Sequence, residues 1–282
     1  MPHILLLTTA PLPHADTEIE ELASVLESLG ARATVIPWFD VPALEEPYDL
    51  VVIRSTWDYF QRVAEFHTVL AGLTAPLANS LETVKWNSHK GYLVQLAAAG
   101  IPVIPTAVVT AGTSPESLPS LDGAAHDHGI IIKPAVSAGA IGVGRYQSRD
   151  AAALAHLREL TAHQDALVQP FVPEVADGEI SIQFIEGQYS HAVLKVPAAD
   201  DFRVQEEHGG RTTPYQPSDA ELAVATAAIG QVTEGLLYAR VDLVRTADGP
   251  KVMELELIEP ALFLPTAPGS TEKLAKAILA RV

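Results

Sequence analysis

The first third of the chain alternates short apolar runs with an amphipathic segment, and this pattern restricts the folds that it can adopt. Apolar runs lie at residues 4–8, 33–38 and 49–54, and residues 17–29 have the spacing of an amphipathic helix. Short apolar runs of this kind are typical of parallel strands in a sheet that helices cover on both faces. We therefore predict an α/β domain at residues 1–78, with its ligand at the carboxyl ends of the strands.

The periodicity changes after this first domain. A helix is expected at residues 80–99, and most later apolar runs have the length and alternation of strands. The expected strands lie at residues 130–133, 167–171, 180–185, 190–196, 239–245 and 251–258, with helices at 150–160 and 219–235. The rest of the chain is therefore predicted to be antiparallel sheet with helices packed on it.

Acidic residues outnumber basic ones, which limits the partners of the protein. The chain has 18 Lys and Arg and 35 Asp and Glu, so its formal net charge is −17. Such a field repels polyanions, and neither nucleic acid nor an acidic membrane surface is expected as a partner. The phosphates of a nucleotide would need locally concentrated cations, so the position of each lysine is informative.

Cysteine is absent, and this excludes several kinds of chemistry. Disulfides, thiolate nucleophiles and cysteine-based zinc sites cannot form. The apolar run at residues 4–7 is too short for a signal or membrane helix. We therefore expect a cytoplasmic protein that does not enter a membrane.

Two carboxylates share one face of a predicted strand near the end of the chain. Residues 251–257 alternate strictly, so Glu254 and Glu256 point the same way. Asp242 lies in the preceding strand, and a hairpin loop of odd length would bring it opposite them, whereas an even loop would not. Three converging carboxylates select Mg²⁺ or Mn²⁺. The alternative is the solvated face of an ordinary amphipathic strand.

Two lysines lie in segments that suit phosphate binding. Lys133 ends a strongly apolar strand, and the small residues at 137–145 would let backbone amides approach phosphate oxygens. Lys90 lies within the predicted helix at residues 80–99. The alternatives are a glycine-rich hairpin that only turns and a surface lysine on a helix.

Further along the chain, residues 167–172 form an apolar strand end whose backbone could read an adenine edge. Glu179 follows a predicted turn and could accept hydrogen bonds from ribose hydroxyls. Lys195 lies in a strand, where a buried lysine needs a partner. An ordinary strand end and a turn acid are the competing interpretations.

The order of these features resembles the ATP-grasp superfamily. The series runs from helix lysine to strand lysine, glycine-rich loop, apolar hinge and ribose acid, and ends with Asp and Glu-x-Glu. Residues 53–59, 87–90, 189–193 and 254–260 are similar to a branch of glutathione synthetase-like enzymes. This branch includes the O-ureido-serine cyclo-ligase of D-cycloserine biosynthesis, an antibiotic pathway.

The resemblance implies a fold of three parts. A pre-ATP-grasp α/β domain at residues 1–78 would lie on the substrate side, and two α+β lobes would clamp ATP. A linker helix and the central ATP-binding lobe would occupy residues 79–168, and the C-terminal lobe with the metal site residues 169–282. Residues 206–213 are polar and contain glycine, as expected of a mobile lid.

The resemblance also implies a role for individual residues. It assigns ATP contacts to Lys90, Lys133, Ser137, Gly139, Gln169, Val172 and Glu179, and metal coordination to Asp242, Glu254 and Glu256. It assigns catalysis to Lys195 and Arg203, and substrate binding to Arg54, Ser55, Thr56, Asp58 and Glu259. Glutathione synthetases usually have Asn where Glu256 stands, so this metal site carries one more negative charge.

These roles imply an ATP- and Mg²⁺-dependent ligase, with Mn²⁺ as an alternative ion. The ligase would activate the carboxylate of a small amino-acid-like substrate as an acyl phosphate and form a C–N bond, by ring closure of O-ureido-serine to cycloserine. One alternative is an intermolecular carboxylate-amine ligase, as in dipeptide or glutathione-like synthesis. Another is a non-catalytic ATP-binding regulator. The sequence leaves a homo-oligomer open.

Overall fold

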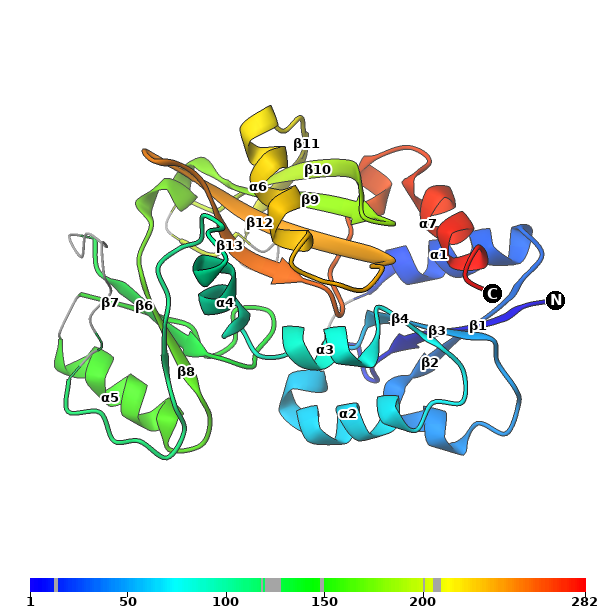
Figure 1. The fold of residues 1–282 in the computed structure, drawn as a ribbon, viewed down its shortest axis with the longest axis horizontal. Coiled ribbons are helices and arrows are strands. Elements are labelled where there is room, and N and C mark those ends of the chain that lie inside the picture. Colours follow the sequence, from blue (N-terminus) through cyan, green and yellow to red (C-terminus); the bar gives the residue numbers. More distant parts are fainter. Residues whose placement is uncertain (13–14, 118, 120–127, 148–149, 200, 205–208) are drawn as a thin grey trace.

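The computed structural model describes residues 1–282 except 13–14, 118, 120–127, 148–149, 200 and 205–208. It contains three sheets, two of four strands and one of five. Figure 1 shows the first domain and the central lobe at opposite ends, with the five-stranded sheet above them. No helix among the described residues is long and apolar enough to cross a membrane.

The first domain is a parallel sheet in the order β2-β1-β3-β4. Its elements are β1 (His3–Thr8), α1 (Thr17–Ser28), β2 (Arg32–Pro37), β3 (Leu50–Ser55), α2 (Val63–Ala71) and β4 (Leu77–Ala78), with 3-10 turns at Trp38–Ala43 and Tyr59–Arg62. Ile4 and Leu6 of β1 pack with α1, whereas Leu5 and Leu7 pack with Phe66 of α2. Both faces are covered, which confirms the predicted α/β domain.

Helix α7 (Ser270–Leu279) returns from the C-terminal part of the chain to the first domain. Leu274 and Ile278 of α7 share a core with Leu22 and Leu26 of α1, and Figure 1 shows the two helices next to each other. The predicted C-terminal lobe at residues 169–282 thus includes a helix that belongs to the core of the first domain.

The central lobe contains an antiparallel sheet in the order β5-β8-β6-β7. Its elements are β5 (Ala107–Val109), β6 (Ile130–Pro134), β7 (Gly144–Tyr146), α5 (Ala151–Thr161) and β8 (Ala166–Pro170). Leu157 of α5 packs on Ile130 and Ile132 of β6. Asp150 caps the N-terminus of α5, because its side chain accepts hydrogen bonds from two backbone amides of the first turn.

The single helix predicted at residues 80–99 is wrong. The segment forms two helices, α3 (Leu81–Asn87) and α4 (Tyr92–Ala98). Between them the amide of Lys90 donates to the carbonyl of Ala135 at 2.8 Å, a bond to the segment after β6. This tertiary bond replaces the helical one, and it breaks the helix at the lysine that was predicted to bind ATP.

The third sheet has the order β11-β10-β9-β12-β13 and is antiparallel. Its elements are β9 (Glu179–Ile185), β10 (Gln188–Val196), β11 (Arg211–Tyr215), α6 (Asp219–Ile229), β12 (Tyr238–Thr246) and β13 (Gly249–Glu256), with 3-10 turns at Pro173–Asp177 and Leu264–Thr266. Helix α6 ends before the predicted residue 235. The predicted lid at 206–213 is corrected in part, because residues 211–215 pair with β10 as a strand; residues 206–208 lie outside the described residues.

In the β12–β13 hairpin, Asp242 lies opposite Glu254 as predicted, but the loop length is not the reason. Thr246 pairs with Gly249 across a two-residue turn, an even loop that would place Asp242 opposite Met253. The register shifts by one residue at Met253, between the Asp242–Glu254 and Leu243–Val252 pairs. This β-bulge brings Asp242 opposite Glu254. The predicted pairing is therefore confirmed, but the bulge and not the loop length produces it.

Asn79 joins the first domain to the third sheet. It is 1% exposed and has a left-handed φ of 58°, which Asn tolerates better than most residues. Its amide donates to the carbonyls of Tyr238 and Leu257 at 2.9 and 2.8 Å, and its oxygen accepts from the amide of Leu237 at 2.7 Å. The side chain thus satisfies three buried backbone groups.

Replacing Asn79 by alanine should lower the free energy of unfolding by about 2–3 kcal/mol, because the three buried groups lose their partner. Urea denaturation measures this change. Asn79→Gly is the matched control for backbone strain, since glycine accepts a positive φ and loses only the hydrogen bonds. A change below about 0.5 kcal/mol in both variants would contradict the role of Asn79.

Candidate active site

A cleft of about 910 Å³ lies where the three sheets meet. The predicted residues that line it are Arg54, Lys90, Lys133, Ser137, Gly139, Gln169, Val172, Glu179, Lys195, Arg203, Glu254, Glu256 and Glu259. They come from the first domain, the central lobe and the C-terminal sheet. Folding therefore collects in one place most of the residues that were chosen from dispersed segments.

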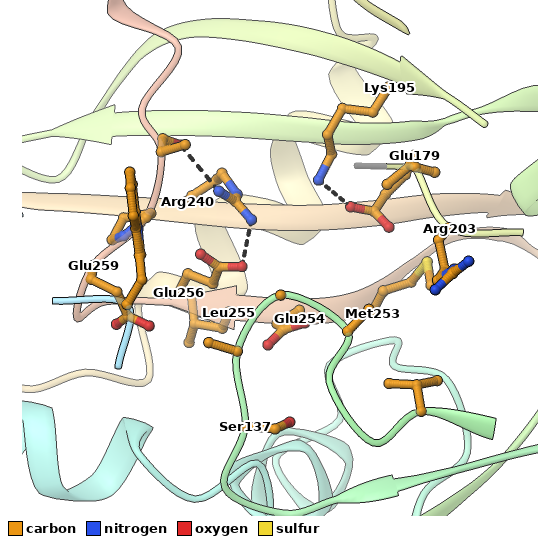
Figure 2. A pocket seen from close by; sticks show the side chains of 18 of the residues that line it. Ser137, Glu179, Lys195, Arg203, Arg240, Met253, Glu254, Leu255, Glu256 and Glu259 are labelled. Carbon is orange, nitrogen blue, oxygen red and sulfur yellow. Dashed lines mark hydrogen bonds and ion pairs between the residues drawn. The ribbon is translucent and has the colours of Figure 1, made fainter. Parts of the chain in front are cut away.

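Glu254 and Glu256 line the cleft from the same strand, β13 (Figure 2). Oε1 of Glu254 is 3.0 Å from Nζ of Lys90. Burial would raise the pKa of Glu254, but Lys90 and Lys133 hold it below its usual value. Burial raises the pKa of Glu256 to about 7, against the opposing effect of Arg240. The surroundings of the two carboxylates thus shift their pKa values in opposite directions.

The donor chemistry of this face fits a hard divalent cation, because two partly buried carboxylates line the cleft. Asp242, the third predicted ligand, does not line the cleft and is 3% exposed. In the part of the chain that the structure describes, no three Asp, Glu, His or Cys side chains are grouped around one position. The metal set remains a prediction that rests on Glu254 and Glu256.

Asp242 is instead surrounded by hydrogen-bond donors. It accepts hydrogen bonds from Ser181 at 2.5 Å, from Nη2 of Arg240 at 2.9 Å and from Lys195 at 3.4 Å. Burial would raise the pKa of Asp242, but Arg240 and Lys195 hold it well below its usual range. Asp242 is therefore ionised at neutral pH, as a metal ligand must be.

Arg240 is a site residue that the sequence prediction missed. Its guanidinium lies between Asp242 and Glu256 and forms ion pairs with both, and it also donates to the carbonyl of Ala261 at 3.1 Å. Figure 2 shows it directed at Glu256. Alternation along β12 places Arg240 and Asp242 on one face, so the Arg-x-Asp pattern could have indicated it.

The three lysines of the cleft differ in their partners. Lys195 forms ion pairs with Glu179 and Asp242, and these carboxylates raise its pKa although burial opposes them. Lys90 pairs with Glu254. Lys133 has no ion pair within the described residues, and burial lowers its pKa. Lys133 is thus the lysine of the cleft that is available to an incoming anion.

Arg203 lies at the edge of the cleft and its side chain is 38% exposed. Its guanidinium forms a two-pronged pair with Asp201, with Nη2 at 2.7 Å and Nε at 3.1 Å. The structure thus places Arg203 beside the cleft, bound to a neighbour in the chain. Its predicted catalytic role stays a prediction.

Three of the predicted substrate residues do not line the cleft. Ser55 is buried and bonds to Thr8 at 2.8 Å, and Thr56 is also buried. Asp58 accepts hydrogen bonds from Trp38 at 2.8 Å and Arg62 at 3.0 Å. These side chains lie outside the lining of the cleft, and their assignment as substrate contacts stays a prediction. Alternating neighbours line the cleft instead, as Trp57 and Tyr59 do.

Family comparison agrees with this architecture. Residues 97–264 match the sequence model of the prokaryotic glutathione synthetase ATP-grasp domain. This chain is a member of that ATP-grasp family. Residues 4–79 of the ATP-grasp protein match a second model, the N-terminal domain of D-cycloserine synthetase DcsG. The predicted superfamily and the predicted ligase class are confirmed.

Whole-chain comparisons give the same result. The ATP-grasp ligase is 31% identical to cycloserine biosynthesis protein DcsG of Streptomyces lavendulae, over 99% of this chain and 98% of that one. The crystal structure of D-cycloserine synthetase DcsG superposes with a TM-score of 0.86 at 30% identity, covering 99% of both chains. D-alanine–D-alanine ligase of Bacillus anthracis in complex with ATP shares the fold, with a TM-score of 0.70 at 15% identity and coverage of 100% and 97%.

Proposed function

We propose that this ATP-grasp ligase closes O-ureido-serine to cycloserine, with ATP and Mg²⁺. The observation that carries the proposal is the match of residues 4–79 to the N-terminal domain of D-cycloserine synthetase. The ATP-grasp half is also shared with glutathione synthetases, so it supports ATP use but does not select a substrate. The first domain contributes Arg54, Trp57 and Tyr59 to the cleft, and it is the part of the chain that matches the D-cycloserine synthetase domain.

The cations of the cleft support phosphate binding. Lys133 lies in the wall without an ion pair among the described residues, and Lys90 donates to the carbonyl of Ser137 in the wall of the cleft. Positioning and charge neutralisation account for most of the catalysis in phosphoryl transfer. Glu254 and Glu256, with Asp242, would hold Mg²⁺, which when bound neutralises charge on the phosphates.

In the proposed reaction a carboxylate oxygen of the substrate attacks the γ-phosphorus of ATP, which releases ADP and leaves an acyl phosphate. The side-chain nitrogen next to oxygen then attacks the acyl carbon. This C–N bond closes the ring, inorganic phosphate leaves and the nitrogen loses its proton. Cycloserine lacks the carbamoyl group that this nitrogen carries, so water must release that group as carbamic acid.

We expect O-ureido-serine alone to stimulate ADP release, and the product to have the mass of cycloserine. A coupled assay of ADP and mass spectrometry of the product measure both outcomes. An intermolecular ligase would require a second amine for turnover. A non-catalytic regulator would bind ATP without releasing ADP with any amino acid. Either outcome would overturn the proposal.

A further inference from the structure

The segment at residues 258–264 forms the wall of the cleft beyond the acidic strand. Glu259, Pro260, Ala261 and Phe263 all line the cleft. The main chain of this segment is held mainly by side chains from other elements. Tyr238 donates a hydrogen bond to the carbonyl of Ile258, and Arg54 donates to that of Pro260. Arg240 donates to the carbonyl of Ala261, and His191 donates to that of Leu262.

Phe263 has an unfavourable backbone conformation within this segment. Its φ of 52° and ψ of 35° lie in the left-handed region, which costs a residue with a side chain about 1–2 kcal/mol. Such a conformation persists only where the surroundings stabilise it. The amides on both sides of Phe263 bond to one carboxylate, that of Glu18.

Glu18 belongs to the first turn of α1 in the first domain. Its Oε2 accepts from the amide of Leu262 at 3.0 Å and its Oε1 from the amide of Leu264 at 3.1 Å. Nη2 of Arg54 is 3.4 Å from the same carboxylate and also donates to the carbonyl of Pro260 at 3.1 Å. The side chain of Glu18 is 14% exposed and lines the cleft.

We propose that Glu18 is a positioning residue for the amino-acid substrate. Its carboxylate holds Leu262 and Leu264, and thereby fixes the conformation of Phe263 and the place of Glu259 in the cleft wall. It acts from the domain that matches D-cycloserine synthetase, on the segment that directly follows the acidic strand. The identity of the substrate rests on the proposed function, whereas the positioning role does not.

The position of Glu18 predicts which kinetic constant depends on it. Lys90 bonds to Glu254 and to the carbonyl of Ser137, and Lys133 lies on β6. The hydrogen bonds among the described residues connect none of these three side chains to Glu18. In Glu18→Gln, the KM for O-ureido-serine should rise about tenfold, because charge-assisted hydrogen bonds to two amides are weakened. The KM for ATP should stay within about twofold of its original value. Glu21→Gln is the matched control, since Glu21 is exposed on the same helix.

Hydrogen–deuterium exchange tests the positioning role without any substrate. The amides of Leu262 and Leu264 should exchange faster in Glu18→Gln, and at the original rate in Glu21→Gln. If exchange rises but O-ureido-serine releases no ADP from the original protein, the proposed function fails and the positioning role stands. Unchanged exchange at both amides, or an equal rise in the KM of both substrates, would overturn the proposal.

A Phe263→Asn variant tests whether Glu18 stabilises the left-handed conformation of Phe263. Asparagine tolerates the left-handed region better than phenylalanine, so Glu18→Gln should change exchange at Leu262 and Leu264 less in a Phe263→Asn background. This non-additivity is the signature of two residues that act on one conformation. Additive effects of the two substitutions would show that Glu18 does not stabilise Phe263.

Discussion

Replacing Glu254 by glutamine should reduce the rate of ADP formation at saturating substrate by at least about a hundredfold, the scale of losing one charge-stabilising group in an active site. The glutamine keeps the shape of the side chain but removes its charge. Glu254 pairs with Lys90 and lines the cleft beside Glu256. The substitution therefore removes a carboxylate from the proposed metal site and the partner of a lysine that is proposed to bind phosphate.

The same assay at increasing Mg²⁺ concentration shows whether the loss of rate in Glu254→Gln arises from weaker metal binding. If Glu254 acts through the metal, the Mg²⁺ concentration for half-maximal rate should rise together with the loss of rate. Glu234→Gln is the control, because Glu234 is exposed and outside the cleft. An unaltered rate at saturating substrate and Mg²⁺ would exclude Glu254 from the site.

Replacing Arg240 by methionine should lower the free energy of unfolding by about 3 kcal/mol, the lower end of the range for breaking a buried ion pair, because Asp242 keeps other partners and Glu256 is only partly buried. Arg240 is 8% exposed and forms ion pairs with Asp242 and Glu256. Asp242 would retain Ser181 and Lys195, but Glu256 has no other ion pair among the described residues. Urea denaturation measures the loss.

A double variant assigns that loss to Glu256. Arg240→Met with Glu256→Gln should recover a large part of the stability, because the uncompensated charge is gone. The exposed Arg32–Glu46 pair supplies the control, since its side chains are 49% and 56% exposed and Arg32→Met should cost less than about 1 kcal/mol. If the Arg240 and Glu256 substitutions were simply additive, the two groups would not be coupled.

The first domain was predictable because its strands are covered on both faces. Continuous apolar runs identify such strands directly, and β1 and β3 agree with their predicted limits within about one residue. The break between α3 and α4 was not predictable, because it depends on a bond from Lys90 to Ala135 in another element. Local periodicity contains no signal for that bond.

In the candidate site too, local sequence patterns predicted some residues, whereas contacts between distant segments determine others. Alternation placed Glu254 and Glu256 on one face, and the bulge at Met253 kept Asp242 opposite Glu254. Glu18 could not be found in this way, since the amides that it binds lie 244 and 246 residues away along the chain. Only the folded arrangement of the first domain shows the connection.

The return of α7 to the first domain determines when that domain can be completed during synthesis. Leu274 and Ile278 fill the side of the core that Leu22 and Leu26 leave open. The ribosome makes α7 after both lobes, so residues 1–78 must wait with an exposed apolar face until the lobes have emerged. Residues 1–78 are made before both lobes and are therefore among the last to reach their native packing, and the part of the cleft that Arg54, Trp57 and Tyr59 line forms with them.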